Sequence, residues 1–319
     1  MNRRSFIKKT AAGAIIAGIP AASSLLSSCS NVKAAGIGIC DWDLGHTPND
    51  PFTPSTPASV FVPRAESVGY EAIQVSVGTS PDNIMLRDPE VRKKYIELGK
   101  RHNIVYCSVA VGSILHYRPL TTEPESAIYM LDGLEAASAL GAKNILLAFF
   151  FDGDLLERDS SGNYINISGG ASPEYKWKEK DVERLIALMK QLAPRAEDLG
   201  VAMGIENALT ARQNIQIIEE VGSPMAQIYY DIGNSWSMGY DVPAEIREIG
   251  NDDMCEIHIK NMGSRLLFGD EGIVDMKACA DALKEIGYDK WLVIETIGRP
   301  NRFEEDARAN IDFTRRVFM

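Results

Sequence analysis

The chain is poor in basic residues, histidine and cysteine for its length. Its 319 residues include 33 Lys and Arg against 44 Asp and Glu, a formal net charge of −11, and only 4 His. Proteins bind nucleic-acid phosphates through clustered Lys and Arg, so this balance argues against a nucleic-acid-binding protein. The 5 Cys are too few for a disulfide scaffold in a chain this long.

The chain also lacks the composition of a disordered or a collagen-like protein. It is 45% hydrophobic and 24% charged, which is ordinary for a soluble globular chain. No run of residues has the character of a domain linker. The length is compatible with one large α/β domain, since α/β barrels reach about 250 residues as a single domain.

The first 28 residues predict an export signal. Residues 2–9 (NRRSFIKK) resemble a twin-arginine signal, whose export route carries folded proteins. Residues 11–26 are apolar but contain Gly, Pro and Ser, and the stretch is short for a membrane span. We therefore expect residues 1–28 to be a leader and not part of the fold.

The end of this leader resembles a lipoprotein cleavage box. Leu26, Ser27 and Ser28 precede Cys29, so we expect a lipid on Cys29 and a short tether over residues 29–36. Ordinary signal-peptidase cleavage near residues 34–35 is the alternative. The sequence thus predicts an exported, periplasmic protein that is held at the membrane only through this lipid.

The remaining cysteines predict no disulfide. Three of the four fall in short apolar runs, where a cysteine usually serves as a small buried hydrophobic residue. Export in a folded state also removes any need for a disulfide. The four residues expected to be buried are Cys40, Cys107, Cys255 and Cys279.

Short apolar runs alternate with stretches of helical periodicity after residue 36. The apolar runs are residues 36–42, 72–77, 104–111, 144–151, 201–208, 227–232, 255–261 and 291–296. Helical periodicity is clear over residues 90–101, 126–140, 181–199, 214–221 and 276–286. Glycines shortly before an apolar run mark helix ends at Gly141, Gly200, Gly222 and Gly287.

Eight such repeats predict a parallel (β/α)8 TIM barrel as a single domain over residues 37–319. An open doubly wound sheet is the alternative, but no G-x-G-x-x-G motif follows the first apolar run. Residues 152–175 and 43–63 are long irregular segments that follow expected strands. In a barrel such segments lie on the active face, so we expect binding loops there, with a passive surface insertion as the alternative for the longer one.

One potential metal ligand stands near the end of each of the last four expected strands. These residues are Glu206, Asp231, His258 and Glu295. Branched apolar residues alternate with them, so the ligands face the barrel interior if the apolar residues face the helices. A single acid at a strand end is often a helix cap or an ion-pair partner. Four converging ligands instead predict a divalent cation, which compensates the buried carboxylates.

A set of three carboxylates and one imidazole suits hard or borderline cations. We expect one Mn²⁺ ion, with Mg²⁺ and Zn²⁺ as alternatives. Lys260 lies two residues after His258 and therefore also faces the barrel interior. We expect it either to stabilise an oxyanion as a catalytic group or to form an ion pair with Glu206 or Asp231.

These strand motifs resemble those of the xylose isomerase-like sugar isomerase and epimerase superfamily, and in mechanism its ketose 3-epimerases. The motifs are IEN at residues 205–207, DIG at 231–233, HIKN at 258–261 and IET at 294–296. The segment FGDEGIVD at 268–275 resembles a further loop of that superfamily. The resemblance covers about residues 36–317.

The resemblance implies a metal bound by Glu206, Asp231, His258 and Glu295, and an acid–base pair formed by Glu206 and Glu295. It implies proton abstraction beside a carbonyl, through an enediolate, on a neutral sugar or keto-sugar. Elimination from 3-keto-glycosides is the alternative within this chemistry. A non-catalytic sugar-binding lipoprotein is a further alternative, and the few His argue against a related apurinic endonuclease.

The motifs also depart from the ketose epimerases. Asn234 replaces a His, Ser264 followed by Arg265 replaces an Arg, and Gln74 stands where many relatives have Glu. We therefore expect changed substrate contacts around a small carbohydrate, and a homo-oligomer is compatible with this class of barrel. The residues expected to bind substrate are Trp42, Gln74, His116, Asn234, Trp236 and Arg265.

Overall fold

A computed structural model describes most of the chain after the leader. The described residues are 33–44, 57–116, 118–123, 125–169, 172–262, 266–268, 274–296, 298–299 and 301–319. All of them belong to one compact unit, Asn31–Met319. The predicted leader, the predicted lipidation site at Cys29 and Arg265, which was predicted to bind substrate, lie outside the described residues.

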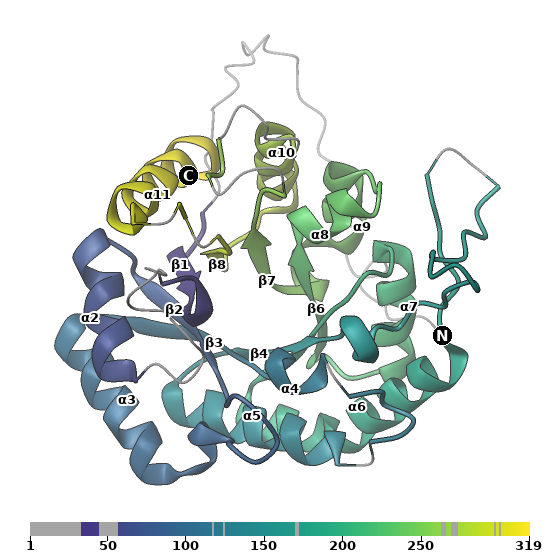
Figure 1. Cartoon of the computed structure of the whole chain (residues 1–319), viewed down its shortest axis with the longest axis horizontal. Helices are drawn as coiled ribbons and strands as arrows, with labels where there is room; N and C mark the ends of the chain where they lie inside the picture. Colours follow the sequence, from purple (N-terminus) through teal and green to yellow (C-terminus); the bar gives the residue numbers. More distant parts are fainter. Residues whose placement is uncertain are drawn as a thin grey trace, which may run out of the picture. The chain divides into compact units, whose positions relative to one another are not determined.

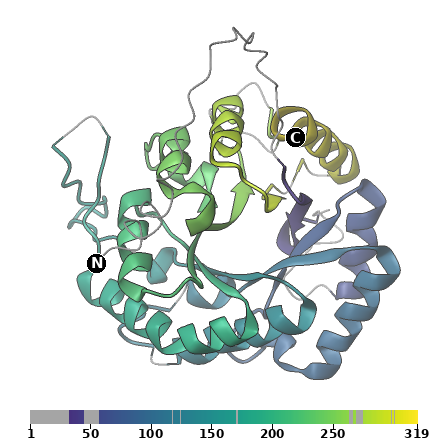
Figure 2. The ribbon, with the colours of Figure 1, turned by 180° about the vertical axis from the view of Figure 1, so that it is seen from behind.

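Eight parallel strands close into a barrel in sequence order, as the alternation predicts (Figures 1 and 2). The strands are β1 (Gly36–Cys40), β2 (Ala72–Ser76), β3 (Val105–Ala110), β4 (Asn144–Ala148), β5 (Ala202–Glu206), β6 (Ala226–Asp231), β7 (Met254–Ile259) and β8 (Trp291–Ile294). β1 pairs with β8 to complete the barrel. The prediction of a (β/α)8 barrel is confirmed, and the alternative of an open sheet is wrong.

Helices surround the strands in both views (Figures 1 and 2). They are α2 (Ala58–Val68), α3 (Pro89–His102), α4 (Gly112–Leu115), α5 (Ser126–Leu140), α6 (Glu179–Leu199), α7 (Ala211–Val221), α8 (Ile232–Ser237), α9 (Val242–Asp253), α10 (Met276–Ile286) and α11 (Phe303–Phe318). The five helices expected from periodicity are present. The loop expected over residues 43–63 is shorter, because α2 begins directly after Pro57, which favours a helix start.

The alternation of side chains along each strand separates two hydrophobic regions. Ile257 and Ile259 of β7 belong to the large core between strands and helices, where they are fully buried. A second set, which includes Ala110, Leu146, Tyr229 and Cys255, fills the barrel interior. Side chains thus fill the barrel interior up to the carboxyl ends of the strands. The inward-facing polar side chains gather at those ends.

The four cysteines of the described part are buried and free, as expected. Cys40, Cys107 and Cys255 lie in the small clusters of the barrel interior, and Cys279 lies in the core under α10. Among the described residues, none of the helices is both long enough and apolar enough to cross a membrane.

In the described part of the segment between β4 and α6, antiparallel bridges join Leu156 to Trp177 and Arg158 to Tyr164. The segment starts with the short 3-10 helix η3 (Phe151–Gly153). Gly153 lies against the end of α4, where its N–H donates to the His116 carbonyl oxygen over 2.9 Å. A Cβ atom at Gly153 would lie 2.2 Å from the Leu115 carbonyl oxygen, so this close approach requires glycine.

Glu245 on α9 gives a prediction on stability. Its carboxylate accepts hydrogen bonds from the Ala211 N–H and the Tyr230 hydroxyl, each over 2.8 Å. Burial raises its pKa from 4.5 to about 7, although these hydrogen bonds act in the opposite direction. The folded state therefore binds this proton more tightly than the unfolded state. The resulting stabilisation is complete below pH 4.5 and is lost as the pH rises through about 7.

We expect this group to lower the free energy of unfolding by about 3 kcal/mol between pH 4.5 and pH 8. Urea unfolding across that range should show the decline in the wild type and a flatter profile in Glu245→Gln. The exposed Glu219→Gln on α7 serves as the control. Parallel profiles for wild type and Glu245→Gln would show that Glu245 does not titrate in this way.

Candidate functional site

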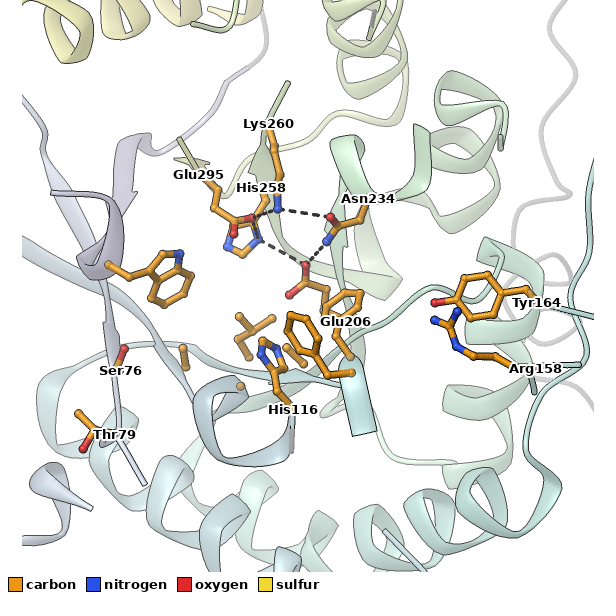
Figure 3. A pocket seen from close by; sticks show the side chains of 17 residues that line it. Ser76, Thr79, His116, Arg158, Tyr164, Glu206, Asn234, His258, Lys260 and Glu295 are labelled. Carbon is orange, nitrogen blue, oxygen red and sulfur yellow. Dashed lines mark hydrogen bonds and ion pairs between the residues drawn. The ribbon is translucent and has the colours of Figure 1, made fainter. Parts of the chain in front are cut away.

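The four predicted metal ligands meet at the carboxyl end of the barrel. Glu206 and Asp231 are the last residues of β5 and β6, His258 lies near the end of β7, and Glu295 follows β8. Each offers one ligand atom, and these atoms all lie within 4.8 Å of one another. Figure 3 shows Glu206, His258 and Glu295 pointing toward one another at the top of the strands. The four residues form what we call the ligand cluster.

The distances within the ligand cluster centre on one imidazole nitrogen. Nδ1 of His258 lies 3.7 Å from Glu206 Oε1, 3.6 Å from Asp231 Oδ2 and 3.3 Å from Glu295 Oε2. Nδ1 of His258 and Oδ2 of Asp231 are buried and make no hydrogen bond within the described part of the chain. Buried polar atoms rarely stay unsatisfied, so this donor set fits a divalent cation.

The charged groups in and around the ligand cluster shift one another's pKa. Burial raises the pKa of Glu295 to about 7, against the attraction of Lys260 and His258. Burial also raises the pKa of Asp231, but Lys260 and His258 outweigh burial and leave it below its ordinary value. Burial lowers the pKa of His258, and Glu295 and the other carboxylates reverse this and raise it well above 6.5. A cation bound at Nδ1 would displace that proton.

Lys260 and Asn234 connect the glutamates across the cluster. The Lys260 ammonium donates to Glu295 Oε2 over 3.0 Å and to the Asn234 carbonyl oxygen over 3.3 Å. The Asn234 amide in turn donates to Glu206 Oε1 over 2.9 Å. Burial lowers the pKa of Lys260, but Asp231, Glu295 and Glu206 together raise it, so the group stays positively charged. Both alternatives predicted for Lys260 are compatible with this position.

Gln74 lies behind His258. Its side-chain N–H2 donates to Ser108 Oγ and to Tyr229 Oη, each over 2.9 Å, which uses both amide hydrogens. Its oxygen therefore faces His258 and accepts from Nε2–H over 2.9 Å. Cys40 Sγ donates to the same oxygen over 3.3 Å. This network fixes Nε2 as the donor and leaves Nδ1 directed at the ligand cluster.

The Gln74 contact gives a prediction on metal affinity. Gln74→Met keeps a similar volume but removes the acceptor for His258, so we expect divalent-cation affinity to fall by about 10- to 100-fold. Isothermal titration with Mn²⁺ measures this directly. Gln74→Glu retains an acceptor oxygen and should recover most of the affinity. Equal affinity in Gln74→Met and wild type would show that the contact does not orient His258.

A cavity of about 690 Å³ opens above the ligand cluster. Its described lining includes Trp42, His116 and Asn234, as expected for residues that contact substrate. The Trp42 ring lies edge-on to His258, with ring centroids 6.4 Å apart. Burial lowers the pKa of His116, which favours a neutral imidazole at the cavity wall.

Two residues expected at the substrate lie elsewhere. Gln74 is fully buried and lies below the cavity, because it stands in the middle of β2 and not at its end. Trp236 packs against the main core and is absent from the described cavity lining. The reason is that α8 begins directly after Asp231 and turns this side chain toward the helices. The third, Arg265, lies outside the described residues.

Sequence reasoning missed several residues around the site. Asp41 accepts from the Ser76 N–H over 2.7 Å and from its hydroxyl over 2.9 Å, and so joins β1 to β2 beside the cavity. Tyr229 donates to Glu256 Oε2 over 3.0 Å beneath the ligand cluster. Glu256 lies on the same face of β7 as His258, and this alternation could have indicated that the Tyr229–Glu256 pair lies in the barrel interior. The binding loop predicted over residues 152–175 contains Arg158 and Tyr164 of the cavity lining, but the sequence did not single out these two residues.

Comparisons with known proteins agree with this geometry. A sequence model of the family described as "Xylose isomerase-like TIM barrel" matches residues 62–317. No curated protein matches the sequence. Among solved structures, D-psicose 3-epimerase from Clostridium cellulolyticum H10 is similar, with a TM-score of 0.69 and 16% identity over 89% of this chain and 99% of that chain.

Two further structures illustrate the range of similar enzymes. D-allulose 3-epimerase from Methylomonas sp. gives a TM-score of 0.66 and 15% identity over 91% of this chain and 99% of that chain. 3-keto-D-glucoside 4-epimerase from E. coli gives a TM-score of 0.65 and 13% identity over 88% of this chain and 99% of that chain. At such identities the similarity concerns the fold, which positions the ligand cluster at the carboxyl ends of β5 to β8.

Proposed function

Because the chain belongs to the xylose isomerase-like TIM barrel family, we propose that it is a metal-dependent sugar isomerase or epimerase. The observation that carries this proposal is the ligand cluster of Glu206, Asp231, His258 and Glu295 at the floor of a cavity. The substrate is a neutral sugar or keto-sugar. The cavity contributes aromatic faces and the polar groups of the cluster.

In the proposed reaction, one of the two glutamates removes the proton from the carbon beside the substrate carbonyl. The C–H electron pair forms the C=C bond of an enediolate, and the carbonyl π electrons move to oxygen. The other glutamate returns a proton to the opposite face, which inverts that carbon. Glu206 and Glu295 stand on β5 and after β8, so they approach the cavity from different strands. Asn234 and Lys260 hold these carboxylates in place.

A divalent cation, when bound by the cluster, supplies Lewis acidity that stabilises negative charge on the substrate oxygens. Mn²⁺ is our proposal, because three carboxylates with one imidazole form a mostly oxygen donor set. The Lys260 ammonium, with its three donors, can direct one N–H toward an enediolate oxygen while it remains paired with Glu295.

A second candidate reaction is elimination from a 3-keto-glycoside. Here the same base removes the C2 proton, the electrons pass through the enediolate, and the C1–O bond breaks. The opposite glutamate protonates the leaving oxygen. The cavity favours this candidate, because it extends from the ligand cluster to Arg158 and Tyr164 in the loop after β4, and so holds more than one hexose.

Solvent exchange tests the proposal. The full chain is loaded with Mn²⁺ and incubated in D₂O with free ketoses and with 3-keto-glycosides, and loss of C–H signal is followed by NMR. Exchange at a carbon beside the carbonyl supports proton abstraction, and the product distinguishes epimerisation from elimination. Sugar binding without exchange for every substrate would instead support the non-catalytic binding protein.

We also propose that the enzyme works outside the cytoplasm, exported through the signal in residues 1–28 and anchored by a lipid on Cys29. The support is the sequence of that segment. Radiolabelled palmitate incorporation in a producing bacterium tests the anchor: wild type should be labelled, and Cys29→Ser should not. A wild-type chain without label would contradict the lipid anchor.

A further inference from the structure

The cavity has a second wall whose residues take no part in the proton transfers proposed above. Phe150, Phe151, Arg158 and Tyr164 line it on the side of the loop after β4, and we call these four residues the loop wall. Figure 3 shows Arg158 and Tyr164 set apart from Glu206, His258 and Glu295. A sugar ring at the ligand cluster would therefore leave the loop wall for another part of the substrate.

A buried carboxylate holds Arg158 and Tyr164 of the loop wall in a fixed arrangement. Asp154 is 2% exposed and accepts from the Tyr164 hydroxyl over 2.8 Å and from Arg158 Nη2 over 3.2 Å. The Arg158 guanidinium lies over the Tyr164 ring, 3.9 Å from its centroid. Arg158 Nη1 also donates to the Gly162 carbonyl oxygen over 2.9 Å. The arginine and the tyrosine thus form one preorganised, flat surface.

Phe151, a further residue of the loop wall, combines an exposed side chain with a rare backbone conformation. Its side chain is 66% exposed, and its φ of 53° lies in the left-handed region that bulky residues rarely adopt. Its ring lies 5.6 Å from that of His116, and the Phe150 ring lies 5.5 Å from the same histidine. Strained backbone conformations cluster at ligand-binding sites, and Phe151 combines such a conformation with an exposed ring in the cavity lining.

The side chains of the loop wall favour a ligand that contains a ring. Aromatic faces pack against the C–H face of a sugar or against another aromatic ring. The guanidinium of Arg158 can stack on a ring or donate to hydroxyl groups at its edge. The Asp154 carboxylate beside this wall is already occupied by the Tyr164 hydroxyl and the Arg158 guanidinium. A neutral ring with polar substituents at its edge satisfies all of these groups.

We infer that the loop wall is a subsite for a second ring, so that the substrate is a glycoside. This inference rests on the proposed function, because it places the reacting sugar at the ligand cluster. In a glycoside the anomeric carbon is blocked, so the carbonyl needed for proton abstraction lies at a ring carbon that once carried a hydroxyl group. The substrate is therefore the product of a preceding hydride-removing oxidation of a glycoside.

Binding of unreactive ligands tests the subsite without requiring turnover. The Mn²⁺-loaded full chain is titrated with methyl glucoside as the one-ring ligand, and with methyl cellobioside and phenyl glucoside as two-ring ligands, all of them blocked at the anomeric carbon. None of them offers a ring carbonyl at the reacting carbon. We expect at least one two-ring ligand to bind about tenfold more tightly than methyl glucoside. Methyl cellobioside and phenyl glucoside distinguish a sugar from an aromatic second ring.

Variants assign the gain to the loop wall. Phe151→Ala and Arg158→Ala should each remove most of the tenfold gain and leave the affinity for methyl glucoside within twofold. Lys176→Ala, an exposed residue of the same loop outside the cavity lining, should change neither affinity. Equal binding of one-ring and two-ring ligands by the wild type would overturn the inference, as would a preference that survives in both variants.

The two proposals fail separately. A two-ring preference that depends on Phe151, without solvent exchange in any carbonyl sugar, would leave the subsite standing and contradict the proposed reaction. Solvent exchange with free ketoses and no two-ring preference would leave the reaction standing and contradict the subsite.

Discussion

Replacement of Glu295 by Gln is expected to abolish solvent exchange at the substrate carbon. The amide cannot accept the proton, and it is also a weaker ligand in a cluster whose atoms lie within 4.8 Å of one another. Loss of a general base alone lowers kcat by about 10²- to 10⁴-fold. We therefore expect a fall of at least 10³-fold in the rate of deuterium incorporation measured by NMR.

Two control measurements show whether the loss of exchange is due to loss of the Glu295 base. Glu219→Gln makes the same chemical change at an exposed position on α7 and should retain wild-type exchange. The Mn²⁺ content of Glu295→Gln, measured after dialysis, separates loss of the base from loss of the cation. Exchange within tenfold of wild type in a metal-loaded Glu295→Gln would exclude Glu295 as the base.

Removal of the cation is expected to have the second large effect, on both stability and activity. Without a cation, His258 and Lys260 are the positively charged groups that pair with both Asp231 and Glu295 in the described part of the chain. A cation at 1,000 times its Kd stabilises the folded state by about 4 kcal/mol. Chelation should therefore lower Tm by several degrees and reduce solvent exchange to background, and Mn²⁺ should restore both.

The His258→Ala variant provides the matched control for chelation. It lacks the nitrogen at the centre of the cluster, so its Tm should respond little to chelator or to added Mn²⁺. Titration of the chelated wild type with Mn²⁺, Mg²⁺ and Zn²⁺ then ranks the three cations. If chelation changed neither the Tm nor the exchange rate of the wild type, the proposal of a metal-dependent enzyme would be contradicted.

Strand parity made the ligand cluster predictable from sequence. Side chains alternate between the two faces of a strand, so Ile257 and Ile259 in the helix-facing core leave His258 pointing inward. In parallel strands that close into a barrel, the carboxyl ends lie at the same edge. Residues at the ends of four consecutive strands therefore converge, whatever the intervening helices contain.

Depth and helix direction were not predictable in the same way. Gln74 has the inward parity of a ligand, but its place in the middle of β2 puts it one layer below the cavity. Trp236 follows Asp231 closely in sequence, yet α8 carries it to the main core. Position along the strand decides the first outcome, and the first turn after the strand decides the second. The predicted run over residues 72–77 placed Gln74 near its middle, but the sequence did not show how far down the strands the cavity reaches.

The sequence by itself determined the eight-fold alternation of strands and helices, the inward parity of the strands and the four members of the ligand cluster. These features depend on local periodicity, which a linear sequence records. The tertiary structure alone decided that Gln74 orients His258, that Asn234 and Lys260 bridge the glutamates, and that Arg158 and Tyr164 reach the same cavity. Such contacts join residues far apart in the chain, and only the closed barrel fixes the distances between them.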